Sequence, residues 1–161
     1  MTTIAYIGFG SNLGDSMAIL AITKNEINAV EGISLKRLSP LYRTKPINIP
    51  DSQKDFINGV FEIETTLVAK TVLQELNTIE DRLGRNRGKV KNLARTLDLD
   101  LLLFGNKEMK SKTLTLPHPR IYQRAFVLFP LYDLSPELEI PGQGSVRDLL
   151  ENVRDQEVER L

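Results

Sequence analysis

The sequence has 161 residues, enough for one ordinary domain that buries its own core, and we expect a single domain over residues 1–161. It has no cysteine, which excludes disulfides, zinc–thiolate sites and cysteine nucleophiles, and its 21 basic residues balance 21 acidic ones, so net charge does not favour nucleic acid or anionic lipid as a partner. No stretch approaches the roughly 18 apolar residues of a membrane span and the N-terminus does not look like a signal peptide, so we expect a cytoplasmic protein.

The first part of the chain predicts a strand, a helix and two more strands. Thr3 to Gly8 is typical of a buried strand, and apolar residues at helical spacing predict a helix over about 16–30. A strand is expected over 34–44, followed by a proline-containing loop and another strand over 56–63. Gly59 inside this last strand predicts a bulge or a close approach near a ligand.

The second part of the chain predicts a helix over 68–83, a strand over 96–104 and a hairpin strand over 113–116. Shorter helices are expected over 124–131 and 146–153. The order strand, helix, strand, strand, helix, strand predicts an α+β fold of the ferredoxin-like type, with helices packed on one face of an antiparallel sheet and room for a three-layer elaboration.

Two aspartates on the strand over 96–104 carry the most specific chemical signal. Asp98 and Asp100 are two residues apart, so their side chains should project from the same face, while Leu97, Leu99 and Leu101 enter the core. Two carboxylates without His or Cys suit magnesium. The alternative is the solvated face of an amphipathic strand, although paired like charges disfavour one another unless a cation neutralises them.

A basic segment directly precedes this acidic pair. Residues 82–95 contain no acid and six basic residues, namely Arg82, Arg85, Arg87, Lys89, Lys91 and Arg95. By itself this pattern also fits a solvated loop or a nucleic-acid patch. Followed by the acidic pair it favours phosphoryl transfer, which needs both metal and guanidinium charge. The sequence has neither a Walker A motif nor a complete dinucleotide fingerprint.

His118 is the only histidine, and it lies between Pro117 and Pro119. The flanking prolines restrict the backbone and could aim its ring at a ligand. A structural or incidental role is the alternative, and a lone histidine argues against a histidine-rich metal site.

Three segments together resemble the 6-hydroxymethyl-7,8-dihydropterin pyrophosphokinase family: Arg95–Asp100, Leu116–Arg120 and Arg124–Leu128. In family order the resemblance also covers Gly10–Asp15, Tyr42–Pro46 and Phe56–Asn58, so it spans most of the chain. It implies a ferredoxin-like core and an enzyme of folate biosynthesis. The implied reaction transfers pyrophosphate from ATP to the hydroxymethyl group of 6-hydroxymethyl-7,8-dihydropterin, which gives AMP and the pterin diphosphate.

The resemblance also implies roles for individual residues. Asp98 and Asp100 would hold two Mg²⁺ ions that bridge the ATP phosphates, while Arg85 and Arg95 would stabilise the transferring group. The implied ATP site comprises Asn77, Glu80, Arg87, Leu101, Thr115, His118 and Arg124. The implied pterin site stacks the ring between Phe56 and Phe126, with Asn58 and the backbone near Thr44 and Ile47 reading its polar edge. Without the resemblance, these aromatic residues would be interpreted as core and the polar ones as surface.

We also expect a monomer that binds the two small-molecule substrates and, because of the balanced charge and the lack of a long apolar stretch, neither nucleic acid nor membrane. The sequence departs from the family where Asn92, Leu93 and Ala94 replace a usual Trp-Gly-Pro, which changes the hinge of the basic segment but not its charge. Phe56 stands where the family often has tyrosine, so stacking is kept and a hydroxyl is lost.

Two other functions fit parts of the pattern. A ferredoxin-like RNA-binding module would use the basic residues, but no strand shows the aromatic-rich pattern that holds unstacked bases. A nucleotidyltransferase with an Asp-x-Asp pair would release pyrophosphate instead of AMP. The general base stays unassigned, because Asp100 would be a weak base while bound to a metal.

Overall fold

The computed structural model describes residues 1–12, 14–45, 55–83 and 97–161. Its elements in chain order are β1 (Thr3–Ser11), α1 (Ser16–Asn28), β2 (Ile33–Leu38), β3 (Tyr42–Thr44), β4 (Phe56–Thr65), α2 (Ala69–Leu83), β5 (Leu97–Phe104), β6 (Met109–Lys110), β7 (Thr115–Leu116), the 3₁₀ helix η1 (Ile121–Gln123), α3 (Ala125–Leu134), β8 (Glu139–Ile140), β9 (Gly144–Ser145), α4 (Val146–Glu151) and β10 (Glu159–Arg160).

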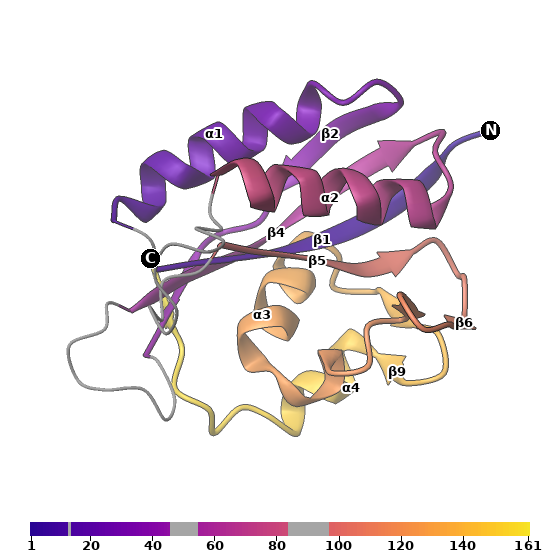
Figure 1. Cartoon of the computed structure of the whole chain (residues 1–161). Helices are drawn as coiled ribbons and strands as arrows, with labels where there is room; N and C mark the ends of the chain where they lie inside the picture. The colour runs from indigo at the N-terminus through magenta and orange to yellow at the C-terminus, as the bar shows by residue number, and fades with distance from the viewer. Residues whose placement is uncertain (13, 46–54, 84–96) are drawn as a thin grey trace.

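The main sheet has the strand order β10-β3-β4-β1-β5, and β2 also pairs with β4. Every pairing in it is antiparallel. The first long strand, β1, therefore lies between β4, which precedes α2, and β5, which follows it, and this is the ferredoxin-like arrangement predicted from the element order. Figure 1 shows β1, β4 and β5 running side by side through the middle of the molecule.

The single strand expected over 34–44 is divided into two strands, β2 and β3, so the prediction of one continuous strand was wrong. Pro40 has no backbone N–H to donate, and Ser39 turns its hydroxyl to the backbone N–H of Val60 at 2.9 Å. Beyond this break β3 continues along the same edge of β4, where Thr44 lies opposite Phe56. The break thus leaves β3 in position to form one wall of a cavity.

Helices cover both faces of the sheet, whereas the simplest ferredoxin-like expectation covers one (Figure 1). The reason lies in the strands, which are apolar on both sides. Ala5, Ile7 and Phe9 of β1 join the core beneath α1 and α2. Tyr6 and Val60 join a second core beneath α3 and α4. The molecule is therefore the three-layer version of the fold.

Local features explain several boundaries. Asp15 caps α1 by accepting a hydrogen bond from the Ala18 amide at 3.0 Å, and the helix ends at Asn28, two residues before the expected end. Gly59 pairs in regular register with Phe9 on one edge of β4, whereas on the other edge the chain gains one residue between the Leu38–Phe61 and Tyr42–Asn58 pairs. A Cβ at Gly59 would lie 2.8 Å from a methyl carbon of Leu41. The expected close approach is therefore present, but it is made by the Leu41 side chain.

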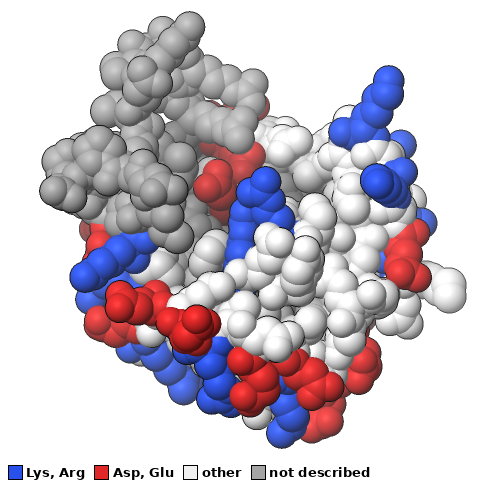
Figure 2. All heavy atoms as spheres, turned by 90° about the horizontal axis from the view of Figure 1, so that it is seen from below, with Lys and Arg blue, Asp and Glu red and all other residues white. Residues whose placement is uncertain are grey.

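The surface charge is mixed. Figure 2 views the face that carries α3 and α4, and it shows Lys and Arg interleaved with Asp and Glu. No helix in the described part of the chain is both long and apolar enough to cross a membrane.

Candidate active site

The acidic pair lies on β5 as its alternating pattern predicts. Leu97, Leu99 and Leu101 are buried in the core, while Asp98 is exposed and Asp100 is half-buried. In the neighbouring strand Gly10 lies opposite Asp98 and Gly8 opposite Asp100. Cross-strand partners share a face and glycine has no side chain. The part of β1 beside the two carboxylates therefore has no side chain of its own on that face.

A buried carboxylate ties α2 to this strand. Glu80 is 5% exposed, and its Oε2 accepts a hydrogen bond from the backbone amide of Leu99 at 2.7 Å. β5 is an edge strand of the main sheet. The contact therefore satisfies a backbone donor on its open edge, between the two aspartates.

Two cavities meet at the acidic pair, since Asp98 and Asp100 line both. The larger cavity, of about 800 Å³, lies between the sheet and the start of α3. It brings together residues from four parts of the chain: Gly8, Gly10, Thr44, Phe56, Asn58, Arg124 and Phe126. Four of these are predicted pterin-site residues, namely Thr44, Phe56, Asn58 and Phe126.

The smaller cavity, of about 340 Å³, lies on the α2 side of β5. It collects five of the predicted ATP-site residues, which are Asn77, Glu80, Leu101, Thr115 and His118. The Leu101 side chain is itself buried in the core. Most of the described residues predicted for the pterin and for ATP therefore line two different cavities, and Asp98 and Asp100 line both.

Backbone contacts hold His118 at the smaller cavity. Its amide donates to the carbonyl of Leu102 on β5 at 2.9 Å, and the Arg120 amide donates to its Nδ1 at 3.2 Å. Burial lowers the pKa of His118, an effect that Asp100 opposes and that Arg124 and Arg120 reinforce. At neutral pH the ring is thus uncharged and carries its proton on Nε2, which leaves Nε2–H as the donor.

The polar part of the larger cavity is ordered by short-range contacts. Asn58 donates from its side-chain amide to the Thr44 hydroxyl at 2.9 Å, so its carbonyl oxygen is oriented by that bond. The Arg124 guanidinium carbon lies 5.5 Å from the centre of the Phe126 ring. Arg124, predicted for ATP, therefore lines the larger cavity beside a predicted pterin residue.

Four predicted site residues lie outside the described residues: Ile47, Arg85, Arg87 and Arg95. Several other residues that line the larger cavity were not predicted from the sequence. Gln156, near the C-terminus, accepts from the Ala125 amide at 3.0 Å and donates to the Gln123 carbonyl at 2.8 Å. Gln156 is therefore hydrogen-bonded to the residues on both sides of Arg124. No motif marked it, because a single glutamine 31 residues away from its partner gives no local pattern.

A family model described as 7,8-dihydro-6-hydroxymethylpterin-pyrophosphokinase matches residues 6–136. The chain belongs to this family. This confirms the resemblance predicted from the sequence, and with it the ferredoxin-like fold and an enzyme of the pyrophosphokinase type. The family's pyrophosphokinases use ATP as co-substrate.

Individual relatives agree with this assignment. The 2-amino-4-hydroxy-6-hydroxymethyldihydropteridine pyrophosphokinase of Haemophilus influenzae is 35% identical over 157 residues, which are 98% of this chain and 97% of that protein. The pyrophosphokinase of the same description from Bacillus subtilis is 37% identical over 148 residues, covering 92% and 87%. The folic acid synthesis protein fol1 of Schizosaccharomyces pombe is 39% identical over 138 residues, but these are only 19% of that longer protein.

Solved structures support the fold of this pyrophosphokinase. The crystal structure of an HPPK-DHPS in complex with substrates superposes with a TM-score of 0.73 at 14% identity, over 93% of this chain and 43% of that chain. The wild-type HPPK-DHPS of Plasmodium falciparum with pteroate gives a TM-score of 0.71 at 16% identity, over 94% and 42%. The chain thus spans less than half the length of these two-part proteins.

Proposed function

We propose that residues 1–161 act as one pyrophosphokinase domain in which Asp98 and Asp100 stand between bound ATP and bound hydroxymethyl-dihydropterin. The observation that carries this proposal is the lining of two neighbouring cavities by the same two carboxylates. A flat pterin would occupy the larger cavity, and the nucleotide would enter from the smaller one. The reacting groups would then meet at the acidic pair.

The pterin assignment rests on the chemistry of the larger cavity. Phe56 and Phe126 come from β4 and α3 and offer aromatic surfaces for a flat heterocycle. Asn58 and Thr44 add hydrogen-bonding groups at the same cavity, and the backbone near Ile47 would complete the polar edge. Apolar walls with a few placed polar groups are typical of small-molecule sites.

The nucleotide assignment rests on the smaller cavity and on the basic segment that precedes β5. Asn77, Thr115 and the neutral Nε2–H of His118 offer hydrogen bonds there. Glu80 and Leu101 bound this space from α2 and β5. Arg124 from the adjoining cavity and Arg87 would bind phosphate oxygens, and Arg85 and Arg95 would spread the charge that develops on the transferring group.

The acidic pair fits Mg²⁺. Two hard carboxylate ligands stand beside a part of β1 that has no side chains of its own, because Gly8 and Gly10 lie opposite. The described residues gather no group of three or more His, Cys, Asp and Glu that could hold a metal, so this pair would leave coordination positions for phosphate oxygens and water. When bound, two such ions would neutralise phosphate charge.

In the proposed reaction the hydroxymethyl oxygen of the pterin attacks the β-phosphorus of ATP. A bond forms between these two atoms, the bond between the β-phosphorus and the α–β bridging oxygen breaks, and AMP leaves with that oxygen. The protein contributes mainly by positioning, since Phe56 and Phe126 hold the ring and Asp98 and Asp100 lie where the two cavities meet. The hydroxyl proton passes to solvent or to a base that stays unassigned.

Product analysis tests this function. The purified chain is mixed with ATP, Mg²⁺ and 6-hydroxymethyl-7,8-dihydropterin, and the products are separated by anion-exchange chromatography. We expect AMP and pterin diphosphate in equal amounts. Release of inorganic pyrophosphate with a pterin–AMP adduct would instead identify a nucleotidyltransferase. The expectations of a cytoplasmic monomer that binds neither nucleic acid nor membrane stay predictions.

A further inference from the structure

Tyr42 on β3 lies next to the strand wall of the larger cavity. It pairs across the sheet with Asn58, and it is two residues from Thr44, to which Asn58 donates. Tyr42 is only 4% exposed and does not line the cavity itself. It therefore cannot be assigned to the site by contact with a substrate.

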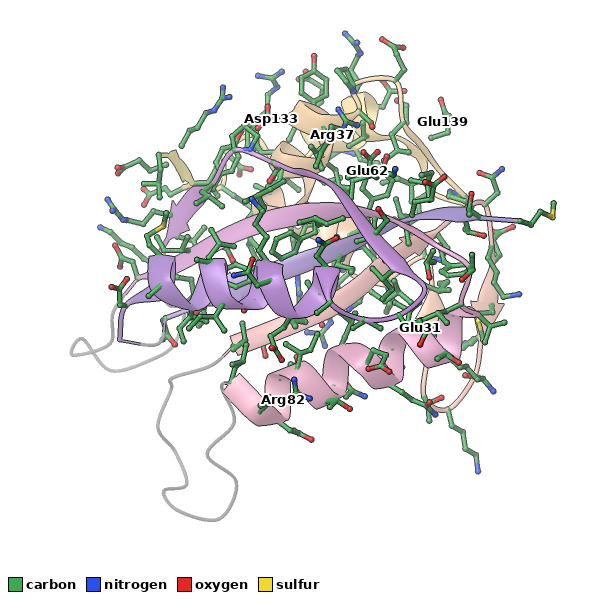
Figure 3. The ribbon with its side chains drawn as sticks, turned by 90° about the horizontal axis from the view of Figure 1, so that it is seen from above. Glu31, Arg37, Glu62, Arg82, Asp133 and Glu139 are labelled. Atoms are coloured by element: carbon green, nitrogen blue, oxygen red, sulfur yellow. The ribbon has the colours of Figure 1, made fainter. Side chains whose placement is uncertain are left out.

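The same side chain is joined to α3, which carries the opposite wall. The Tyr42 ring stacks on Phe129 with centroids 5.7 Å apart and planes inclined by 29°, and its hydroxyl donates to Asp133 Oδ2 at 2.5 Å. Phe126, Phe129 and Asp133 follow one another at helical spacings of three and four, so they share one side of α3. Figure 3 labels Asp133, which α3 carries on the side of the sheet away from α1.

The hydrogen bond from Tyr42 to Asp133 persists over the pH range of ordinary assays. Burial, followed by the hydrogen bond to Asp133 and the charge of that carboxylate, raises the pKa of Tyr42 above its usual value of 10.0. The hydroxyl is therefore protonated at neutral and mildly alkaline pH. Tyr42 can therefore donate its hydrogen bond to Asp133 over this whole pH range.

We propose that Tyr42 is a positioning residue that sets the separation between Phe126 on α3 and the strand wall formed by Thr44, Phe56 and Asn58, and so tunes affinity for the flat pterin ring. This inference rests on the proposed function, because it requires that the larger cavity binds the pterin. A stacked ring needs a slot of fixed width, and Tyr42 is linked to both sides of that slot: by strand pairing to one and by its ring and hydroxyl to the other.

A second tyrosine offers a matched control. The Tyr6 hydroxyl lies 3.0 Å from the Ser135 hydroxyl, at the residue that follows α3, and donates to Glu62 Oε2 at 3.0 Å. Figure 3 shows Glu62 beside Arg37, whose Nε donates to Glu62 Oε1 at 2.7 Å. Tyr6 is 6% exposed, so it resembles Tyr42 in burial, but neither Tyr6 nor its cross-strand partner Glu62 lines the larger cavity.

The test compares Tyr42→Phe with Tyr6→Phe, since each removes one hydroxyl between the sheet and α3. Pterin Kd is measured by fluorescence titration, and KM for each substrate, kcat and Tm are measured beside it. We expect Tyr42→Phe to raise the pterin Kd and KM by about 3- to 10-fold and to change the ATP KM by less than about twofold. Tyr6→Phe should lower Tm to a similar extent while leaving the pterin Kd within about twofold of wild type.

Variants of Asp133 sharpen the comparison. Asp133→Asn keeps an oxygen that accepts from Tyr42 and should stay near wild type, whereas Asp133→Leu should match Tyr42→Phe. The double variant Tyr42→Phe/Asp133→Leu should bind pterin no more weakly than Asp133→Leu alone, because both changes break the same bond.

Phe126→Ala separates failure of this inference from failure of the proposed function. If Phe126→Ala weakens pterin binding while Tyr42→Phe leaves it unchanged, or if Tyr6→Phe weakens it as much as Tyr42→Phe does, the positioning role of Tyr42 is wrong. If Phe126→Ala itself leaves pterin binding unchanged, the larger cavity is not the pterin site and both proposals fall.

Discussion

Glu80 of α2 accepts a hydrogen bond from the backbone amide of Leu99, the residue between Asp98 and Asp100. The carboxylate is buried, and the strand it binds is the edge of the main sheet. Glu80 therefore has a structural role at β5 besides lining the smaller cavity. Loss of this contact would loosen the segment that carries both proposed metal ligands.

Glu80→Leu is expected to lower stability by about 1–3 kcal/mol, because it leaves the Leu99 amide without its side-chain acceptor. Glu80→Gln is the matched control, since its side-chain oxygen can still accept from that amide. Urea unfolding of both variants measures the difference. Equal stability of the leucine and glutamine variants would show that this bond does not hold the strand.

Phe126→Ala is expected to weaken pterin binding by about 1–3 kcal/mol, or about 5- to 150-fold in Kd, because one stacking surface is lost. Phe126→Tyr keeps the ring and should lose far less. ATP binding should be nearly unchanged, since Phe126 does not line the smaller cavity. Fluorescence titration with the pterin and calorimetric titration with a non-hydrolysable ATP analogue check the two halves of this prediction.

Gly10→Ala is expected to raise the KM for pterin by about 3- to 10-fold, because an added Cβ would lie 3.2 Å from Asn58 Oδ1 and push that amide aside. Gly14→Ala serves as the control, since a Cβ there meets no atom within 4 Å. Steady-state kinetics on both variants decide the point. An unchanged pterin KM in Gly10→Ala would argue that the orientation of Asn58 does not matter.

Stability should fall in alkaline solution. The folded pKa of Tyr42 is raised above the unfolded value of 10.0, mainly by burial and then by Asp133. Its contribution to stability is therefore fully present below about pH 10 and is lost as pH rises toward the folded pKa, because the unfolded chain ionises first. Chemical unfolding between pH 8 and 11.5 should show this decline, and Tyr42→Phe should make it shallower.

The sequence predicted the central fold well because each long element carries its own signal. The alternation around Asp98 and Asp100 placed both carboxylates on one side of β5, as the burial pattern confirms. The break between β2 and β3 was missed because apolar residues continue on both sides of Ser39. Pro40 interrupts the strand only because its missing N–H falls where the chain would pair with β4, and the sequence does not show that pairing. The third layer was left open because α3 needs the second apolar face of the sheet to pack against.

The candidate site was predicted unevenly for a related reason. Family motifs indicated Phe126, Asn58 and His118, but the residues that support them act through contacts distant in sequence. Tyr42 reaches Asp133 across 91 positions and Gln156 reaches Ala125 across 31. Neither contact has a sequence period, so only the folded chain reveals them.

The most direct test of the account is the turnover of Asp98→Asn and Asp100→Asn, measured with ATP, Mg²⁺ and hydroxymethyl-dihydropterin. Asp148→Asn, an exposed change on α4, is the control. We predict a loss in kcat of about 10²- to 10³-fold or more for each of the two aspartate variants, with wild-type Tm, because the carboxylates would hold the metal ions that neutralise phosphate charge. Turnover within about tenfold of wild type in both variants would contradict the shared acidic pair as the centre of this reaction.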